Sequence, residues 1–255
     1  MSARILAIHA HPDDIEIQVA GTLLQLKQRG CDIVIATMTP GDKGSAEHTA
    51  EQIAAIRRNE AKAAADILGA EYVCLEFRDL EIDVSDSSRK RVTEAVRRAR
   101  PDLVITAPPV DYMTDHEHTS RLVRDACFCA SVPNYKTHQW DPAPVTGAIP
   151  HLYYCDPIEG VDWYGNSVPY DVIVDVSDEL ETKLEMLACH ASQRKWLRQQ
   201  HGEDEYLDSA RRWGAARGSD VGYGSAEAFR QHNGHPYPHS DRLSELLGLS
   251  DGSVE

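Results

Sequence analysis

Three side chains that could do chemistry are crowded into four residues near the start of the sequence. His11, Asp13 and Asp14 follow the apolar run Ile5 to Ile8, with Pro12 between the imidazole and the carboxylates. The apolar run is typical of a buried strand, and it stops at Pro12 because proline has no N–H to donate to a sheet. From Asp13 onward the apolar spacing becomes helical. The three side chains therefore lie where a strand turns into a helix, which is where open α/β sheets bind ligands.

A plainer interpretation of the same residues is a helix cap. A carboxylate at Asp13 or Asp14 is favoured at a helix N-terminus by the backbone dipole and by the free N–H groups there. A cap needs one carboxylate, however, and it accounts for neither the second one nor His11. This favours a chemical role for the group.

A third ligand beside His11 and Asp14 would complete a histidine–carboxylate–histidine zinc site with one open position. The loop after the strand expected at 102–107 contains Asp115, His116 and His118. His116 precedes the helix expected after this loop, so its side chain can face the first loop. The alternative is that His116 and His118 are solvated surface histidines.

Asp13 would remain free in such a site. Metal coordination lowers the pKa of water to about 7, and a nearby carboxylate can take the proton. Two neighbouring aspartates would then supply a ligand and a general base within two positions. The same base, once protonated, could return its proton to a product amine.

Strands and helices alternate along the first 130 residues. Expected strands lie at 5–8, 32–38, 71–77 and 102–107, and expected helices at 13–28, 49–68, 88–99 and 117–130. Short loops and nearly continuous apolar strands predict parallel βαβ units with right-handed crossovers. The predicted fold is α/β, Rossmann-like, with a mostly parallel sheet and helices on both faces. The loops after the strands should meet at one edge of this sheet.

The second half of the sequence is less regular. After a proline-rich connection at 133–150, we expect strands at 150–155 and 171–176 and helices at 178–199 and 203–213. A glycine-rich stretch and a histidine-rich segment then form an irregular C-terminal excursion. We expect one domain over 1–255, with a parallel βα core at 1–130 and substrate-side additions at 131–255.

Composition narrows the class of protein. The 255 residues are 42% hydrophobic and carry a net charge of -15, which argues against general affinity for nucleic acid or an anionic membrane. No apolar run approaches the ~20 residues of a membrane span. The first strand begins at Arg4, which leaves no room for a signal peptide, so we expect a cytoplasmic protein. The six cysteines form no CxxC pair and fit buried, reduced thiols.

The motifs of this chain, in their order, resemble the PIG-L/LmbE-like family of metal-dependent deacetylases that act on N-acetylglucosamine-type substrates. The motifs cover most of residues 4–130, and the resemblance is weak between 131 and 220. They are Ala10–Asp14, Gly21-Thr22, Thr39–Gly44, Ile56–Glu60, Leu68-Gly69, Arg78-Asp79, Asp115-His116 and, near the C-terminus, Ala226–Arg230.

The resemblance implies roles for particular residues. It implies zinc on His11, Asp14 and His116, Asp13 as general base, and substrate contacts from Arg57 and Asp79. Other divalent metals such as Fe2+ or Mn2+ also suit histidine and carboxylate ligands. Alternatives for the two contact residues stay open: Arg57 could be a helix-surface arginine paired with Glu60, and Asp79 could be a turn former. In the C-terminal motif, Glu227 could be a surface helix charge.

One departure from the family pattern affects the chemistry. Many members have a histidine where this chain has Met113. Tyr112, His118 or His235 could take its catalytic part, and a tyrosine hydroxyl could donate a hydrogen bond to a developing oxyanion. The competing interpretations are that Tyr112 packs ordinarily under the loop and that His118 and His235 have surface or structural roles.

Three functions are compatible with these features. The first is a zinc hydrolase that removes acetyl from an N-acetylated amino sugar or its conjugate. The second is a metal-free nucleotide-binding Rossmann protein, disfavoured because the first turn lacks GxGxxG and carries two carboxylates. The third is a metal-binding protein without turnover, for which Met113 is the support. The expected partner is a small N-acetylated sugar or conjugate, and the resemblance suggests a homo-oligomer.

Overall fold

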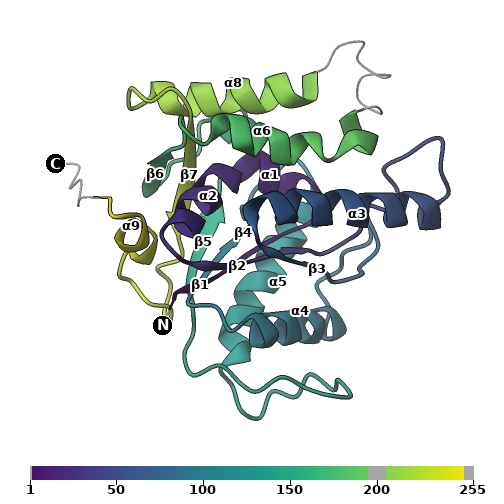
Figure 1. The fold of residues 1–255 in the computed structure, drawn as a ribbon. Helices are drawn as coiled ribbons and strands as arrows, with labels where there is room; N and C mark the ends of the chain where they lie inside the picture. The colour runs from purple at the N-terminus through teal and green to yellow at the C-terminus, as the bar shows by residue number, and fades with distance from the viewer. Residues whose placement is uncertain (1, 195–204, 250–255) are drawn as a thin grey trace.

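A seven-stranded sheet runs through the molecule, and its order is β3-β2-β1-β4-β5-β7-β6 (Figure 1). The computed structural model describes residues 2–194 and 205–249. The strands are β1 (Arg4–His9), β2 (Asp32–Thr37), β3 (Glu71–Cys74), β4 (Leu103–Thr106), β5 (His151–Cys155), β6 (Val172–Asp175) and β7 (Ala226–Gln231). Strands β1 to β5 pair in parallel, whereas β7 is antiparallel to both of its neighbours. The predicted mostly parallel α/β sheet is confirmed.

Helices cover both faces of this sheet. They are α1 (Asp14–Gln18), α2 (Ala20–Gln28), α3 (Ala50–Leu68), α4 (Asp86–Ala99), α5 (Thr114–Ala130), α6 (Leu180–Ala188), α8 (Glu205–Ser219), α9 (Arg242–Leu247) and the 3-10 turn η1 (Ile158–Gly160). Helices α4 and α5 lie on one face, and α1, α2 and α3 lie on the other, with α6 and α8 stacked beyond them (Figure 1). Within residues 2–194 and 205–249, none of these helices combines the length and the apolar character of a membrane span.

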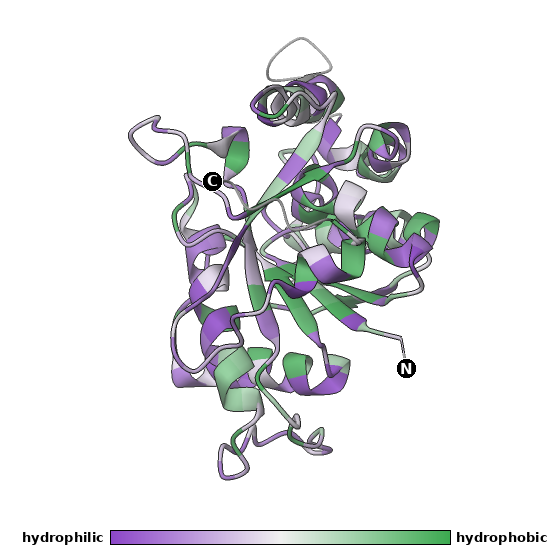
Figure 2. Ribbon diagram, turned by 90° about the vertical axis from the view of Figure 1, so that its left-hand side faces the viewer, coloured by the Kyte–Doolittle hydropathy of each residue, from purple (hydrophilic) through white to green (hydrophobic). Residues whose placement is uncertain are grey.

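Successive side chains of β1 point to opposite faces of the sheet, so β1 contributes to the hydrophobic core on each face. Ile5 and Ala7 pack with the helices on one side, while Leu6 and Ile8 pack with those on the other. Figure 2 shows the hydrophobic strands lying between helices whose outer surfaces are mostly hydrophilic. A strand covered on both faces is apolar in its interior, as β1 is from Ile5 to Ile8. Each fully buried Ile or Leu contributes roughly 1.5–3 kcal/mol relative to an exposed one.

The chain changes sides of the sheet between β1 and β4. The helices that follow β1 and β2 lie on one face, whereas α4 and α5 lie on the other. Strands β1 and β4 are neighbours, so the loops that leave their carboxyl ends diverge and open a crevice. The segment after β1 carries His11 to Asp14, and the first turn of α5 carries His116. The topology alone brings these two segments together.

Three local expectations differ from the structure. The helix expected at 13–28 is two helices, because Val19 (φ -136°) breaks α1 from α2. The helix expected at 178–199 ends as α6 at Ala188, and its last five residues lie outside the described ranges. The helix expected at 203–213 extends as α8 to Ser219.

Helix α8 continues through a glycine because that position touches β7. A Cβ on Gly214 would lie 2.4 Å from the Ser225 hydroxyl, so the absence of a side chain permits close packing of α8 on β7. The motif Ala226–Arg230 is part of strand β7, not a helix. Glu227 is 4% exposed, so its interpretation as a surface helix charge is wrong.

Candidate metal centre

Three side chains meet where the β1 and β4 segments converge. The Nδ1 atom of His11 lies 3.3 Å from Asp14 Oδ2 and 3.3 Å from His116 Nε2, and His116 Nε2 lies 3.5 Å from Asp14 Oδ2. All three residues are buried. Ligand atoms about 2.0–2.1 Å from a tetrahedral zinc ion are roughly 3.3–3.5 Å apart. The three donor atoms therefore fit one ion of that size.

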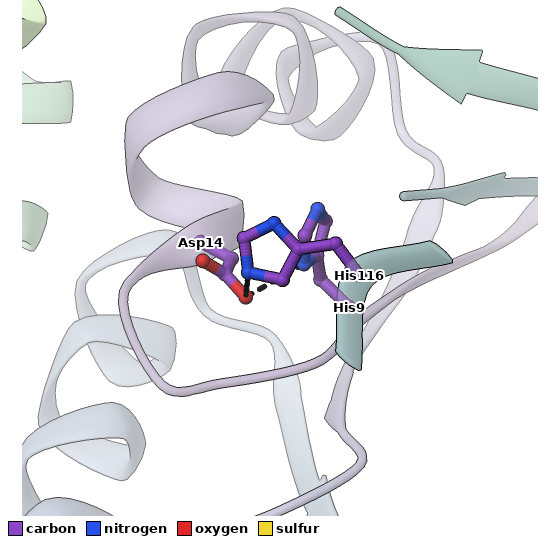
Figure 3. Close-up of side chains that lie close together, drawn as sticks. All are labelled: His9, Asp14 and His116. Atoms are coloured by element: carbon purple, nitrogen blue, oxygen red, sulfur yellow. Dashed lines mark ion pairs between the residues drawn. The ribbon is translucent and has the colours of Figure 1, made fainter. Parts of the chain in front are cut away.

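A further imidazole touches the same carboxylate. His9 is fully buried at the end of β1, and its Nδ1 lies 2.6 Å from Asp14 Oδ2, with its ring edge-on to His116 (Figure 3). This separation is too short for two ligands of one tetrahedral ion, but it fits a charge-assisted hydrogen bond. The Ala10 N–H also points at His9 Nδ1, at a distance of 2.9 Å. The Asp14 carboxylate is closer, at 2.6 Å, and a contact this short requires a proton on Nδ1. His9 therefore supports Asp14.

The remaining ring nitrogens of His11 and His116 face carboxylates. His11 Nε2 lies 3.1 Å from Asp79 Oδ1 and 3.3 Å from Asp115 Oδ2. His116 Nδ1 lies 3.1 Å from Asp111 Oδ1, without the alignment of a hydrogen bond. Carboxylates in these positions favour a proton on the outer nitrogen of each ring. The inner nitrogen is then left free for a metal.

The electrostatics of the cluster favour positive charge. Burial by itself lowers the pKa of His11, but its contacts with Asp115, Asp14 and Asp79 outweigh burial and raise that pKa well above its usual value. Burial also lowers the pKa of His116, but Asp14 and Asp111 together outweigh burial and raise that pKa above its usual value. Burial alone would raise the pKa of Asp14, yet the imidazoles hold it well below the usual range. A site that draws protons onto imidazoles also attracts a divalent cation.

Asp13 lies beside the three donors but points to other partners. Its Oδ2 accepts a hydrogen bond of 2.7 Å from the Tyr206 hydroxyl and one of 3.3 Å from Arg57. Burial raises the pKa of Asp13, as does Asp14, and Arg57 opposes this. Its side chain makes no capping hydrogen bond, so the cap interpretation does not describe Asp13. Its φ of 99° costs about 1–3 kcal/mol for a residue with a side chain, and such strain concentrates at functional sites.

Arg57 is held inside the protein. It lies on the buried face of α3 with Ile53 and Ala61, and its Nη2 donates to the Pro12 carbonyl at 2.7 Å. A Cβ on Gly41 (φ +68°) would lie 2.1 Å from Arg57 Nη1, so the loop at 39–44, here called the glycine-rich loop, closes against the guanidinium.

The surface interpretation of Arg57 is wrong, because this side chain is 4% exposed. Its expected partner Glu60 instead accepts hydrogen bonds from the backbone and hydroxyl of Ser192. The spacing of four residues from Ile53 to Arg57 and from Arg57 to Ala61 places all three on one helix face.

The cluster opens into a cavity of about 430 Å³. This lies within the usual volume of small-ligand sites. His11, Asp13, Asp14, Arg57 and Asp79 line it from the first half of the chain. Asp79 also accepts a hydrogen bond from the Lys43 backbone, which ties the glycine-rich loop to the segment after β3. Asp79 is thus both a lining residue and a support for His11.

Of the three side chains that could replace the family histidine at Met113, the structure places one at the cavity and two away from it. Tyr112 and Met113 line the cavity, and the Tyr112 ring lies 5.4 Å from the His116 ring. His118 instead contacts the Ile82 carbonyl at 2.5 Å and lines a separate hollow. Two residues along a helix correspond to a rotation of about 200°, so His116 and His118 face different sides of α5. His235 is exposed and does not line the cavity. The geometry does not support catalytic parts for His118 or His235.

Several residues of the site were not found by sequence reasoning. His9 had a usable signal, since it ends an otherwise apolar strand two positions before a proposed ligand. Tyr206 and Trp213 of α8 line the cavity, as do Ile158 and Gln193. These four come from the part of the chain where motifs are weak. Their spacing gave no local signal, because the tertiary fold brings them to the cavity.

The fold and the site define an α/β protein with a histidine–carboxylate cluster at the carboxyl edge of a parallel sheet. The family model described as PIG-L, GlcNAc-PI de-N-acetylase, matches residues 6–127. The chain is 31% identical over 196 residues to a diacetylchitobiose deacetylase of Thermococcus kodakarensis, covering 74% of this chain and 70% of the relative. The chain therefore belongs to the PIG-L family of N-deacetylases, and the predicted family resemblance is confirmed.

Two further similarities show what this fold supports. The structure of an N,N'-diacetylchitobiose deacetylase from Pyrococcus horikoshii, complexed with an inhibitor, matches with a TM-score of 0.75 at 26% identity. The match covers 93% of this chain and 87% of that one. A 4-oxalmesaconate hydratase of Pseudomonas putida is 25% identical over 198 residues, covering 74% of this chain and 73% of the relative. The fold thus carries more than one reaction.

Proposed function

We propose that this enzyme is a metal-dependent amide hydrolase that removes the acetyl group from an N-acetylated amino sugar or its conjugate. The observation that carries the proposal is the set of three donor atoms, 3.3 to 3.5 Å apart, beside the separate carboxylate of Asp13. Membership of an N-deacetylase family and the deacetylase from Thermococcus kodakarensis support the same reaction.

His11, Asp14 and His116 would hold the metal. A divalent metal bound there would bring the pKa of water close to neutrality and polarise the amide carbonyl. Two imidazoles and one carboxylate suit zinc, and they also suit iron or manganese. His9, Asp79, Asp111 and Asp115 would orient the three ligands.

Asp13 would carry the proton through the reaction. It takes a proton from water as the water oxygen bonds to the acetyl carbonyl carbon. The bond between carbon and nitrogen then breaks, and Asp13 returns the proton to the leaving nitrogen, giving the free amine and acetic acid. A carboxyl group whose pKa is raised by burial is better suited to both steps than a fully solvated one. The hydrogen bond from Tyr206 holds this carboxylate in place.

Three residues would contact the substrate. Arg57 and Asp79 line the cavity on the side of the glycine-rich loop and would position the sugar. The buried Arg57 Nε has no partner among the described residues. Tyr112 stands at the mouth, 72% exposed, and its hydroxyl would donate to the developing oxyanion where Met113 cannot.

The hydratase relative makes water addition to a carbon–carbon double bond the competing reaction. A substrate with several carboxylates would need unpaired cations in the cavity. Of the described lining residues, Arg57 is near Asp13, and Lys43 lies 2.6 Å from Glu81. Each of the two lining cations therefore already faces a carboxylate, which favours the neutral amide substrate.

The test combines metal content with acetate release. We expect near-stoichiometric metal in the wild type by elemental mass spectrometry, and acetate release from some members of a panel of N-acetylated sugars. His116→Ala should lose the metal. Asp13→Asn should keep the metal and lose about 10²–10⁴-fold in kcat. His118→Ala is the matched control, since His118 faces the other side of the same helix, and it should keep both properties.

Each alternative has its own outcome in this experiment. Full metal content with no acetate released from any sugar would identify a metal-binding protein without this turnover. Equal metal content in the wild type and in His116→Ala would exclude the three-donor site. Unchanged turnover in Asp13→Asn would exclude Asp13 as the base.

A further inference from the structure

An exposed tryptophan is bonded to the backbone of the residue that faces His116. Trp163 is 60% exposed, yet its indole Nε1 donates a hydrogen bond of 2.5 Å to the Asp111 carbonyl. The Asp111 carboxylate in turn lies 3.1 Å from His116 Nδ1. A single buried residue therefore separates this exposed side chain from a proposed metal ligand.

Side chains hold both polar groups of the Asp111 backbone. Its N–H donates a hydrogen bond of 3.0 Å to Glu117 Oε1 in the first turn of α5, and its carbonyl accepts the one from Trp163. Asp111 lies between β4 and α5, so neither a strand nor a helix satisfies these groups. The two side chains therefore determine where the Asp111 backbone lies.

The position of Asp111 decides whether His116 has a partner for its outer nitrogen. Asp111 Oδ1 accepts a hydrogen bond of 3.3 Å from the Met113 N–H. Asp111 Oδ2 and His116 Nδ1 are both buried and have no hydrogen-bond partner among the described residues. A buried polar atom without a partner is costly, and a small rotation of the carboxylate or the ring would join these two atoms. A displaced Asp111 would lose that possibility.

Trp163 is carried by a segment that is itself anchored. Within 158–168, Asp162 Oδ1 accepts hydrogen bonds from two backbone N–H groups of the turn that follows it. At the base of the segment, Arg217 of α8 donates to two backbone carbonyls, at 3.4 and 3.2 Å. The segment thus extends from α8 to the loop that contains Asp111, and Trp163 makes the contact at its far end.

We propose that Trp163 is a positioning residue for the metal centre: its indole N–H holds Asp111 in place, so that the Asp111 carboxylate can orient His116. This rests on the proposed function, because it takes His116 as a metal ligand. A carboxylate that orients a ligating histidine strengthens metal binding. The affinity for metal should therefore depend on a hydrogen bond made by an exposed side chain that lies outside the cluster.

Two variants of Trp163 separate the hydrogen bond from the ring. Trp163→Phe keeps an aromatic ring and removes the donor, whereas Trp163→Gln removes the ring and keeps an N–H the same number of bonds from the backbone. The readout is the dissociation constant for zinc, measured by competition with a chromophoric chelator. Trp163→Phe should raise it about 3–10-fold, less than the 10–100-fold effect of losing a direct partner of a ligand, and Trp163→Gln should stay close to the wild type.

The next residue provides the matched control. Tyr164 is 83% exposed, and Tyr164→Phe also removes one polar hydrogen from an aromatic side chain of the same turn. It should leave the dissociation constant for zinc unchanged. The proposal is overturned if Trp163→Phe binds zinc as tightly as the wild type, if Trp163→Gln binds it as weakly as Trp163→Phe, or if Tyr164→Phe weakens binding equally.

Hydrogen exchange separates this proposal from the proposed function. If no sugar releases acetate, the deacetylase function fails, and the zinc measurement still tests Trp163. If the wild type binds no zinc, the metal centre fails as well, and deuterium exchange of the metal-free protein shows whether Trp163 holds Asp111. The backbone amides of 110–113 should then exchange several-fold faster in Trp163→Phe but not in Trp163→Gln or Tyr164→Phe. Equal exchange in all three variants would reject Trp163 as a positioning residue.

Discussion

His9 is expected to influence metal affinity without being one of the three proposed ligands. Its Nδ1 touches Asp14 Oδ2 at 2.6 Å, which fixes the direction in which the other carboxylate lone pairs point. His9→Ala should weaken metal affinity about 10–100-fold, the usual effect of losing a partner that orients a ligand. The dissociation constant is measured by competition with a chromophoric chelator.

Amide variants of His9 provide the control. In His9→Asn the side-chain amide nitrogen occupies nearly the position of Nδ1, so it should recover most of the affinity. His9→Gln places the amide about one bond further out and should recover little. If Asn and Ala variants bind the metal equally weakly, the hydrogen bond to Asp14 is not what His9 provides.

Tyr206 is predicted to set the pH at which Asp13 can act. The groups that face Asp13 are Arg57, His190 and Tyr206, which lower its pKa, and Asp14, which raises it along with burial. Burial raises the pKa of Tyr206 well above its usual value, so the hydroxyl stays protonated and donates. Tyr206→Phe removes this donor, and the pKa of Asp13 rises further.

Asp13 acts as a base when ionised, so a higher pKa moves the acid limb of the profile of kcat/KM against pH to higher pH. Tyr112→Phe is the control, because Tyr112 packs against the His116 ring. It should lower kcat without moving that limb. An acid limb that stays in place in Tyr206→Phe would show that this hydrogen bond does not control Asp13.

At the level of single residues, the sequence predicted the positions of side chains that lie next to clearly recognisable strands. His11, Asp14 and His116 could be placed because each follows a strand whose apolar pattern is clear. The two interpretations of His118 stayed open in the sequence, because a separation of two along the chain does not say which way a side chain faces until the helix is known to begin at Thr114. Tyr206 lies 193 residues from Asp13 in the sequence, and nothing local to either residue indicates their contact.

Among the elements, β7 is joined to α2 and α6 by one buried carboxylate. Glu227 accepts hydrogen bonds from the backbone N–H groups of Gly21 and Thr22 and from Lys183. Glu227 and Lys183 are 4% and 2% exposed. Glu227→Gln should lower the free energy of unfolding by about 3–5 kcal/mol, because it leaves Lys183 buried without a counter-charge. Urea unfolding followed by circular dichroism measures this.

A double variant and a surface pair test the cause. Adding Lys183→Met to Glu227→Gln should restore part of the lost stability, since no unpaired charge then remains. The exposed pair Lys62–Asp66 on α3 is the control, and Lys62→Met should change stability by less than about 0.5 kcal/mol. Strictly additive losses in the double variant would contradict a charge-pair explanation.

Helices and strands were predicted well where the amino-acid composition of a segment and the spacing of its apolar residues indicate the same structure. The four strands of the first half differ from expectation by a few residues at their ends, and α3 was bracketed by its capping residues Thr49 and Gly69. The C-terminal third was predicted less well. The helix expected to end at 213 continues to Ser219, and Gly214 permits its close contact with Ser225, which directly precedes β7. That contact depends on tertiary packing, which propensity does not encode.

For the whole molecule, the metal cluster connects segments that are distant in sequence. The β1 segment and the start of α5 each supply donors to it, and α8 from the second half covers the resulting cavity. A ligand that binds the folded chain and not the unfolded one stabilises it by RT ln(1 + [L]/Kd), about 4 kcal/mol at a thousandfold excess over Kd. The stability of the entire fold should therefore depend on metal.

Removal of the metal by a chelator should lower Tm by roughly 10 °C, since each kcal/mol corresponds to about 2–4 °C in a protein of this size. Addition of zinc should restore the transition, measured by differential scanning calorimetry. His116→Ala lacks one donor, so its Tm should respond little to zinc, whereas His118→Ala should respond as the wild type does. An equal response in both variants would place the metal away from the cluster. No response in the wild type would mean that the three buried donors close on each other and that their carboxylate–imidazole contacts alone hold the β1 and α5 segments together.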